Sequence, residues 1–179
     1  MWKSGHLDRG SGRVLAAALL ALGGMAAVAA VGGVRINVSR SLPLGVYVKT
    51  NDSSAQLVEF CPAEPFAAES SARGYRTHGT ACPDRALPVL KPVVAVAGDR
   101  VVLAADGIRV NGRLLPQTAP LSRDAVGRIL HPWPFGSYLV EQGSVWVAST
   151  FNRGSYDSRY MGPISVNQIR ARLRPLWIL

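Results

Sequence analysis

A chain of 179 residues is long enough for one domain with a substantial core and too short for two comfortable ones. Hydrophobic residues make up 48% of it and charged residues only 17%, against roughly 25% charge in an average soluble domain, so some apolar sequence must lie outside an ordinary core. The net charge of +9 comes from single Arg and Lys residues scattered along the chain, a pattern that argues against direct nucleic-acid binding and fits proximity to anionic lipid headgroups.

The first predicted element is a membrane-spanning helix at residues 14–34, an uncharged apolar run of about 21 residues and so long enough to cross a bilayer. Three basic residues precede it, so residues 1–13 are expected to form a cytoplasmic tail and residues 35–179 a domain outside the membrane. A cleaved signal peptide is the alternative, since Ala27–Ala29 has the small-x-small pattern of a cleavage site. A buried soluble helix is disfavoured because the run has no polar face.

The next segments are predicted to be a β hairpin followed by a long loop. Residues 35–50 read as strand, tight turn, strand, because apolar runs flank a Ser-Leu-Pro-Leu-Gly stretch. Residues 51–88 are rich in Ala, Ser, Pro and Gly and resemble a loop with one short helix around Pro65 to Arg73.

The long loop contains the two cysteines of the chain, Cys61 and Cys82. Both fall on the side of the membrane where the redox environment lets a disulfide persist, so we expect them to be paired. Two separate buried thiols are the alternative. A metal site is disfavoured because the pair lacks CxxC spacing and no histidine cluster accompanies it.

The second half of the chain is predicted to be mainly antiparallel β structure. From Leu90 to Arg113, apolar runs alternate with turns, and the dipeptides Asp106-Gly107 and Asn111-Gly112 tolerate the positive φ angles of a type I′ hairpin turn. Residues 116–136 return to loop. Further strands are expected within residues 138–149 and at the C-terminal end.

The search for catalytic groups starts from hydroxyls and bases. The histidines, His6, His78 and His131, show no nucleophile-base pattern, so a Ser-His-Asp triad has little support. A lysine amine can activate a serine instead, because burial can lower a lysine pKa by up to about 3–5 units and leave the amine neutral. Lys91, at the head of an apolar β run, is the candidate. An edge lysine that protects a strand from aggregation is the alternative.

Three motifs resemble signal peptidase I, and all occur in the order of that family. The stretch Lys91–Val101 resembles the lysine box, in which a general-base lysine opens a strand that ends in Gly-Asp. The stretch Asn37–Tyr47 resembles the Ser-x-Pro-x-Gly-x-Tyr box of the conjugative-transfer, TraF-type branch, and Ser155–Gly162 resembles the Ser-x-Asp-Ser-Arg box near the end of that fold. Housekeeping signal peptidases carry Ser-Met-x-Pro and an Arg after the lysine, so Ser-Leu-Pro and Pro92 in this chain favour the TraF-type branch.

The resemblance implies roles for particular residues. Ser41 would be the nucleophile and Lys91 the general base of a Ser/Lys dyad. The backbone N–H of Ser41 and the hydroxyl of Ser39 would form the oxyanion hole. Turn-capping is the alternative role for both serines, as it is for most serines beside Pro and Gly.

The third box supplies supporting residues. The resemblance implies that Ser155 hydrogen-bonds and orients the lysine amine. It also implies that Asp157 and Arg159 form an ion pair next to that amine, although a plain surface pair is the alternative for these two residues.

Taken together, the resemblance implies a mainly β fold, a signal-peptidase-like antiparallel β domain behind one N-terminal transmembrane helix. The implied function is that of an inner-membrane serine peptidase with its catalytic domain in the periplasm. It would process a pilin or related precursor of a conjugative type IV secretion system, and members of this branch can cyclise their product. Expected partners are the pilin or preprotein substrate, inner-membrane lipid and other proteins of the conjugation apparatus, with no cofactor. A general signal peptidase and a non-enzymatic pilus assembly factor are the alternatives.

Overall fold

The computed structural model describes residues 12, 14, 15 and 33–179. The expected cytoplasmic tail at residues 1–13 and membrane helix at residues 14–34 therefore lie almost wholly outside the described residues. Within the described part of the chain, no helix is both long enough and apolar enough to span a bilayer.

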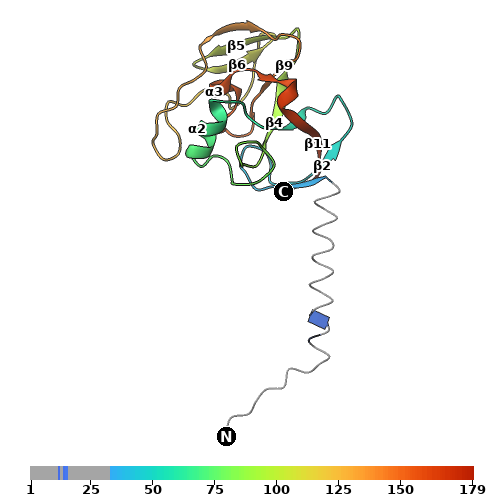
Figure 1. Ribbon diagram of the computed structural model, residues 1–179. Helices are drawn as coiled ribbons and strands as arrows, with labels where there is room; N and C mark the ends of the chain where they lie inside the picture. Colours follow the sequence, from blue (N-terminus) through green and yellow to red (C-terminus); the bar gives the residue numbers. More distant parts are fainter. Residues whose placement is uncertain (1–11, 13, 16–32) are drawn as a thin grey trace.

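Two antiparallel sheets form the body of the protein (Figure 1). In the described residues the larger sheet has seven strands, in the order β1-β2-β11-β3-β4-β9-β10. Its strands are β1 (Val34–Asn37), β2 (Gly45–Thr50), β3 (Leu57–Phe60), β4 (Val89–Ala95), β9 (Ser144–Val147), β10 (Ile164–Ser165) and β11 (Ile169–Ile178). Each pairing is antiparallel, so the predicted mainly β fold is confirmed.

The smaller sheet lies at the far end of the body from β2 and β11 (Figure 1). Its strand order is β7-β6-β5-β8. The strands are β5 (Arg100–Ala104), β6 (Gly107–Val110), β7 (Arg113–Leu114) and β8 (Gly136–Leu139). The predicted turn at Asn111-Gly112 is confirmed, because both residues have positive φ angles, 49° and 85°, as a type I′ turn requires.

The prediction of a type I′ turn at Asp106-Gly107 is wrong by one residue. Ala104 pairs with Gly107, so the turn residues are Ala105 and Asp106, and neither has a positive φ. Gly107 begins β6, and a Cβ there would lie 2.7 Å from Thr118 Oγ1. The glycine is therefore needed for a close approach of side chain to backbone, which a local turn motif does not reveal.

Short helices complete the fold. The helix predicted around Pro65 to Arg73 is confirmed as α2 (Phe66–Ala72). Among residues 33–179, the other helices are α3 (Ser158–Met161) and the 3-10 turn η1 (Val166–Gln168).

The strand β3 corrects the prediction that residues 51–88 are loop and helix alone. It pairs with β11 on one side and β4 on the other, so it lies inside the large sheet. Val58 and Phe60 of this strand are fully buried. A four-residue strand surrounded by Pro, Ser and Ala carries too little local pattern to be predicted, and its burial comes from partners distant in sequence.

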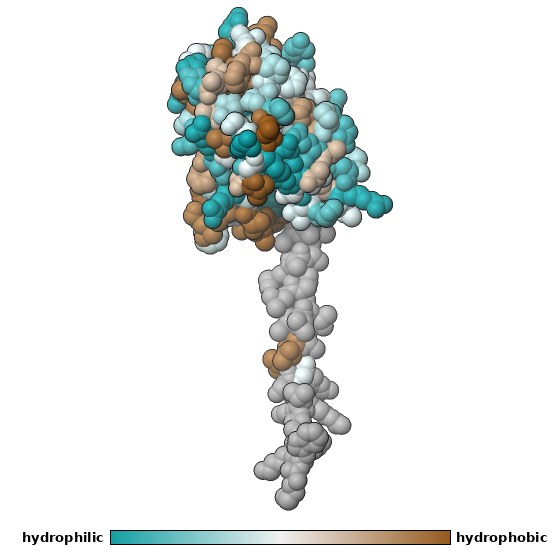
Figure 2. Space-filling view, turned by 90° about the vertical axis from the view of Figure 1, so that its left-hand side faces the viewer, coloured by the Kyte–Doolittle hydropathy of each residue, from teal (hydrophilic) through white to brown (hydrophobic). Residues whose placement is uncertain are grey.

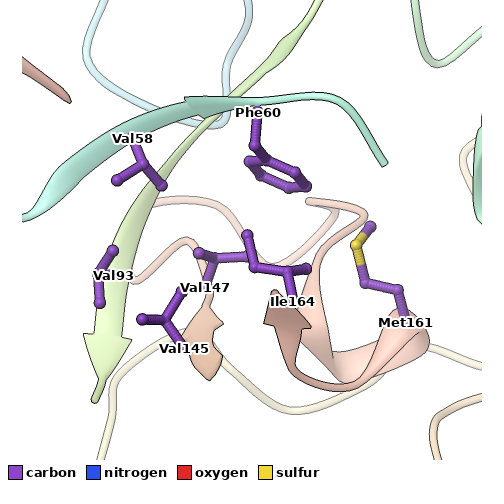
Figure 3. Packing of buried hydrophobic residues seen from close by; sticks show 7 residues of the cluster. All are labelled: Val58, Phe60, Val93, Val145, Val147, Met161 and Ile164. Carbon is purple, nitrogen blue, oxygen red and sulfur yellow. The ribbon is translucent and has the colours of Figure 1, made fainter. Parts of the chain in front are cut away.

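The core beneath the large sheet is a cluster of aliphatic and aromatic side chains that point toward one another from four strands and α3 (Figure 3). It comprises Val58, Phe60, Val93, Val145, Val147, Met161 and Ile164. The residues of β4 alternate along the strand, and Lys91, Val93 and Ala95 are all buried. This period-2 alternation places Lys91 on the core side of β4.

Two constraints hold the start of β2 and the loop before β4. A Cβ at Gly45 would lie 2.2 Å from the backbone oxygen of Trp177, so only glycine lets β11 pair along β2 at this point. A disulfide joins Cys61 to Cys82 and closes the segment that contains α2.

Candidate active site

Ser41 lies on the loop of residues 38–44 that joins β1 to β2, which we call the serine loop. The side-chain amide of Asn37 donates hydrogen bonds to three carbonyl oxygens of this loop, at 3.0, 3.3 and 3.0 Å. The hydroxyl of Tyr47 donates to one of the same oxygens, that of Pro43, at 2.7 Å. The serine loop is therefore fixed by side chains at its two ends.

The structure brings Ser41 and Lys91 together from 50 residues apart. Lys91 Nζ and Ser41 Oγ lie 2.5 Å apart, within hydrogen-bond distance. The lysine is 4% exposed, so its amine is enclosed by the fold rather than held at a sheet edge. The edge-lysine alternative is thereby excluded.

Burial changes the acid-base chemistry of Lys91. Desolvation is the largest cause, and it lowers the pKa of the Lys91 amine from 10.5 to about 8. The carboxylate of Asp157 raises this pKa and the guanidinium of Arg159 lowers it, so the two charges of the pair oppose each other at the amine. A pKa near 8 leaves roughly one amine in ten neutral at pH 7, against about one in several thousand for an ordinary lysine.

Asp157 and Arg159 form a fully buried ion pair, so the surface-pair alternative is wrong. Arg159 Nη2 lies 2.8 Å from Asp157 Oδ2, and both side chains are 0% exposed. The same guanidinium donates to the carbonyl oxygens of Ser155, Arg153 and Gln117, at 2.9, 2.8 and 3.1 Å. The pair therefore ties two loops together behind the catalytic candidates.

Ser155 lies at the predicted place but makes no predicted bond. It is 3% exposed and lines the same hollow as Lys91. Its Oγ has no hydrogen-bond partner among the described residues, so the expected bond to the lysine amine is not formed. The backbone of Ser155 is held by Asn152 and Arg159, while the Lys91 amine lies against Ser41.

Of the two predicted oxyanion donors, one is free to donate and the other is already hydrogen-bonded. The backbone N–H of Ser41 donates to no described residue, so it is available to a developing oxyanion. Ser39 is exposed, and its hydroxyl donates to Asn37 Oδ1 at 2.9 Å. To act on an oxyanion, that hydroxyl has to rotate away from Asn37.

Two hollows flank the dyad, and Ser41 and Lys91 line both. One has a volume of about 260 Å³ and the other about 470 Å³. The smaller is also lined by Ser155, Tyr75, Tyr156 and Leu130. The larger is also lined by Ile36, Val38, Leu87 and Val89. Apolar side chains therefore lie on both sides of the contact between Ser41 and Lys91. No group of three or more His, Cys, Asp or Glu side chains suited to a metal ion occurs in the described part of the chain.

Sequence reasoning assigned no role to two side chains that hold the serine loop, Asn37 and Ser149. Asn37 had a usable signal, because an Asn two residues before a Ser in a turn commonly bonds the backbone. Ser149 Oγ lies 2.6 Å from the carbonyl oxygen of Ser41, a contact between residues 108 positions apart. No local sequence pattern predicts a contact between residues so far apart in the chain.

Comparisons with known proteins point to one family. The family model described as signal peptidase, peptidase S26, matches residues 12–177. The chain is 37% identical over 165 residues to a plasmid transfer protein TraF of Escherichia coli, covering 90% of this chain and 89% of that protein. It is 41% identical over 155 residues to a probable conjugal transfer protein TraF of Sinorhizobium fredii, covering 84% and 80%. It is 35% identical over 170 residues to a conjugal transfer protein TraF of Agrobacterium fabrum, covering 92% and 94%. A crystal structure of a signal peptidase I from Enterococcus faecalis aligns with a TM-score of 0.38 at 16% identity, covering 69% of this chain and 98% of that one.

Proposed function

Because this chain belongs to the signal peptidase family, peptidase S26, and within it resembles the TraF type, we propose that it is a membrane-tethered serine endopeptidase that matures a pilin or related precursor for conjugation. Ser41 is its nucleophile and Lys91 its general base. The observation that carries the proposal is the 2.5 Å contact between Ser41 Oγ and a buried amine whose pKa is lowered to about 8.

The first half-reaction is acylation. Ser41 Oγ attacks the scissile carbonyl carbon while the neutral amine of Lys91 takes the hydroxyl proton. The negative charge that develops on the carbonyl oxygen is stabilised by the Ser41 N–H and, after rotation, by the Ser39 hydroxyl. When the C–N bond breaks, Lys91 returns the proton to the departing amine, and the acyl group remains on Ser41 as an ester.

The second half-reaction determines the product. Lys91, neutral again, takes a proton from the incoming nucleophile, which is either water or the N-terminal amine of the substrate itself. The nucleophile bonds to the acyl carbon, the ester bond to Ser41 Oγ breaks, and Lys91 returns the proton to Ser41. Water gives a hydrolysed peptide and the amine gives a cyclic one. The choice depends on which nucleophile the site holds near the ester.

The hydroxyl of Ser155 has a place in this scheme. It is buried, unpartnered within the described residues and in the same hollow as the dyad. A buried hydroxyl without a partner costs about 1–3 kcal/mol. We assign it the role of accepting a hydrogen bond from the Lys91 ammonium once that amine has taken the Ser41 proton.

An apolar end of the body supports placement of the site beside a lipid surface. Apolar side chains gather at the lower end of the body in Figure 2, the end at which β2 and β11 lie in Figure 1. The exposed apolar residues of the β11 end are Leu176, Trp177, Ile178 and Leu179. Leu179 pairs with Leu44 of the serine loop through a backbone hydrogen bond of 2.9 Å. Such a surface next to the nucleophile suits a substrate that emerges from the periplasmic face of the inner membrane.

The names of the relatives favour conjugation over general secretion as the process served. The test incubates the detergent-solubilised protein with a pilin precursor and, separately, with an ordinary secreted preprotein, and measures intact masses. We expect cleavage of the pilin precursor, and a product lighter by one water than the trimmed peptide if it is cyclised. Equal cleavage of both substrates would indicate a general signal peptidase.

Variants at the dyad separate an enzyme from an assembly factor. Ser41→Ala and Lys91→Ala should each abolish processing. A protein that supports pilus assembly equally well with both substitutions is a scaffold, and that result would refute the proposal.

A further inference from the structure

Ser149 follows the end of β9 by two residues and is completely buried. Its hydroxyl oxygen accepts hydrogen bonds from the backbone N–H groups of Phe151 and Asn152, at 3.2 and 2.9 Å. It also lies 2.6 Å from the backbone carbonyl oxygen of Ser41. Three backbone groups from two distant segments therefore meet at one hydroxyl.

The valence of the hydroxyl fixes the direction of these bonds. A serine hydroxyl has one proton to donate and two lone pairs that accept. The N–H groups of Phe151 and Asn152 occupy both lone pairs, so the proton of Ser149 can go only to the carbonyl oxygen of Ser41. The hydroxyl of Ser149 therefore holds the backbone of Ser41, the proposed nucleophile, and has no other acceptor for its proton.

The residue before Ser149 holds the other member of the dyad. The backbone N–H of Ala148 donates to the carbonyl oxygen of Pro92, the residue directly after Lys91, at 3.1 Å. Ala148 is fully buried as well. Two consecutive residues of one segment therefore bond to the nucleophile and to the strand that carries the base.

The buried ion pair holds this segment in turn. The backbone N–H of Ser149 donates to Asp157 Oδ2 at 3.0 Å, and that carboxylate is fixed by Arg159 on its other side. The chain of contacts from Arg159 through Asp157 and Ser149 to Ser41 consists of hydrogen bonds of 2.6 to 3.0 Å.

We propose that Ser149 is a positioning residue, which together with Ala148 sets the spacing between the Ser41 hydroxyl and the Lys91 amine. The inference rests on the proposed peptidase function. In this arrangement Asp157 and Arg159 also help to position Ser41, because they hold Ser149 in place through hydrogen bonds. This role is separate from the effect of their charges on the pKa of Lys91.

A local turn accounts for only part of this arrangement. A serine that accepts bonds from the N–H groups two and three residues later is a common turn motif. That motif uses only the two lone pairs of the hydroxyl oxygen and leaves its proton free. Here the Ser149 proton is donated to the carbonyl oxygen of Ser41, a residue 108 positions away. Removal of the hydroxyl should therefore affect the reaction as well as the turn.

The test compares cleavage of the pilin precursor by solubilised wild type, Ser41→Ala, Ser149→Ala and Ser158→Ala. Ser158 is the matched control, because it is also fully buried and its hydroxyl accepts one backbone bond, from Val147 at 2.9 Å, without touching the dyad. Ser149→Ala and Ser158→Ala should each lose some thermal stability. Of Ser149→Ala and Ser158→Ala, only Ser149→Ala should lose kcat, by about 10- to 100-fold, the range expected for a misplaced reacting group.

The pH profile separates positioning from loosening of the site. In Ser149→Ala, KM should stay within about twofold of the wild-type value, and the acid limb of kcat should stay at the same pH, because Lys91 remains buried. A loosened site would admit water to the amine and move that limb to higher pH. Ser149→Thr keeps the donor oxygen and should retain at least about a third of the wild-type kcat.

Each outcome decides between two ideas. If wild type cleaves no faster than Ser41→Ala, the proposed function fails and this inference fails with it. If wild type is active but Ser149→Ala keeps its kcat, shifts its acid limb, or is matched by the loss in Ser158→Ala, only the positioning role is overturned. If Ser149→Ala does not fold, a Ser149→Thr protein that folds but is nearly inactive overturns it equally.

Discussion

At residue scale, Lys91 combines an unfavourable position with the proposed chemistry. A lysine on the core side of β4 loses its hydration, and no carboxylate of the described residues forms a salt bridge with its amine to compensate, since that amine bonds to Ser41. The same loss of hydration keeps part of the amine neutral near pH 7, as a general base requires. Stability and activity therefore make opposite demands on this one side chain.

The first prediction concerns the pH dependence of activity. Because the neutral amine is the base and its pKa is about 8, kcat/KM should rise with pH through about 8 and then level off. Cleavage rates measured between about pH 6 and 10 at low substrate concentration check this. If kcat/KM instead rose with a midpoint near pH 10.5, the ordinary pKa of a lysine, the base would not be a buried amine.

The second prediction concerns stability. The pKa of Lys91 is lower in the folded protein than in the unfolded chain, so the fold disfavours the ammonium below about pH 8, and this cost disappears as the pH approaches 10.5. A pKa of about 8 instead of 10.5 corresponds to about 3 kcal/mol at pH 7. Lys91→Met, which fills a similar volume without charge, should abolish activity and raise Tm at pH 7 by about 6–12 °C.

The matching control is the same comparison at high pH. Above about pH 10.5 the wild-type amine is neutral in both states, so the gain in Tm from Lys91→Met should shrink there. An equal or lower Tm for the variant at pH 7 would mean that the lysine contributes packing or hydrogen bonding that outweighs its desolvation.

At element scale, the serine loop is a turn whose carbonyl oxygens are held by side chains. Asn37 bonds three of them and accepts two bonds from Ser39, so the loop between β1 and β2 has a fixed shape before substrate arrives. Preorganised donors and a fixed nucleophile reduce the entropy lost on reaching the transition state.

The third prediction tests that loop. Asn37→Ala removes the donor to three carbonyl oxygens of the serine loop, of which the bond to Leu42 is buried, so it should lower stability by about 1–3 kcal/mol. It should also lower kcat more than it raises KM. Asn167→Ala, at an exposed residue of η1, is the control and should change neither quantity. Chemical denaturation and steady-state cleavage measure both effects. An Asn37→Ala protein with wild-type kcat would show that the loop holds its shape without the amide.

The sequence predicted the parts of the fold whose signals are local. The hairpin at residues 35–50, the turn at Asn111-Gly112 and the helix α2 each depend on a few adjacent residues, and each is present. The prediction of a tight turn within that hairpin is wrong, because the longer serine loop, residues 38–44, joins β1 to β2. The lysine and serine motifs also placed Ser41 and Lys91 on the elements where they lie. Alternating burial along β4 explains why the amine points inward, but the sequence of this strand is an almost unbroken apolar run and does not show which face carries Lys91.

The remaining features depend on contacts between distant segments. The strand β3 is four residues long and is defined by its pairing with β4 and β11. Ser149 looks like any serine after a strand until the fold brings it to Ser41. The missing bond of Ser155 depends on where the amine of Lys91 rests, which in the structure is against Ser41.

At the scale of the whole molecule, the catalytic candidates lie close to an exposed apolar end of the body. A hollow next to this end is lined by Leu42, Leu44, Phe151 and Leu179, together with Arg40. An apolar surface beside a basic side chain fits contact with a lipid surface that contains anionic headgroups. The proposed substrate would meet the enzyme there without leaving the interface.

The fourth prediction tests that contact through Trp177, which is 61% exposed. In proteoliposomes made with lipids brominated near the headgroup, the fluorescence of Trp177 should be quenched. Trp146 is buried and should be unaffected. The quenchable fraction should fall in Trp177→Phe. If that variant is quenched to the same extent as wild type, the apolar end faces water or another protein.

In the proposed reaction, Ser41 forms a covalent ester with its substrate when the Lys91 amine takes its proton. The most direct measurement is mass spectrometry of the protein mixed with pilin precursor and quenched with acid at early times. The proposed ester mechanism gives an acyl adduct on the peptide that contains Ser41, and no adduct in Lys91→Met. An adduct on another residue, or one that forms as fast without the lysine, would contradict it.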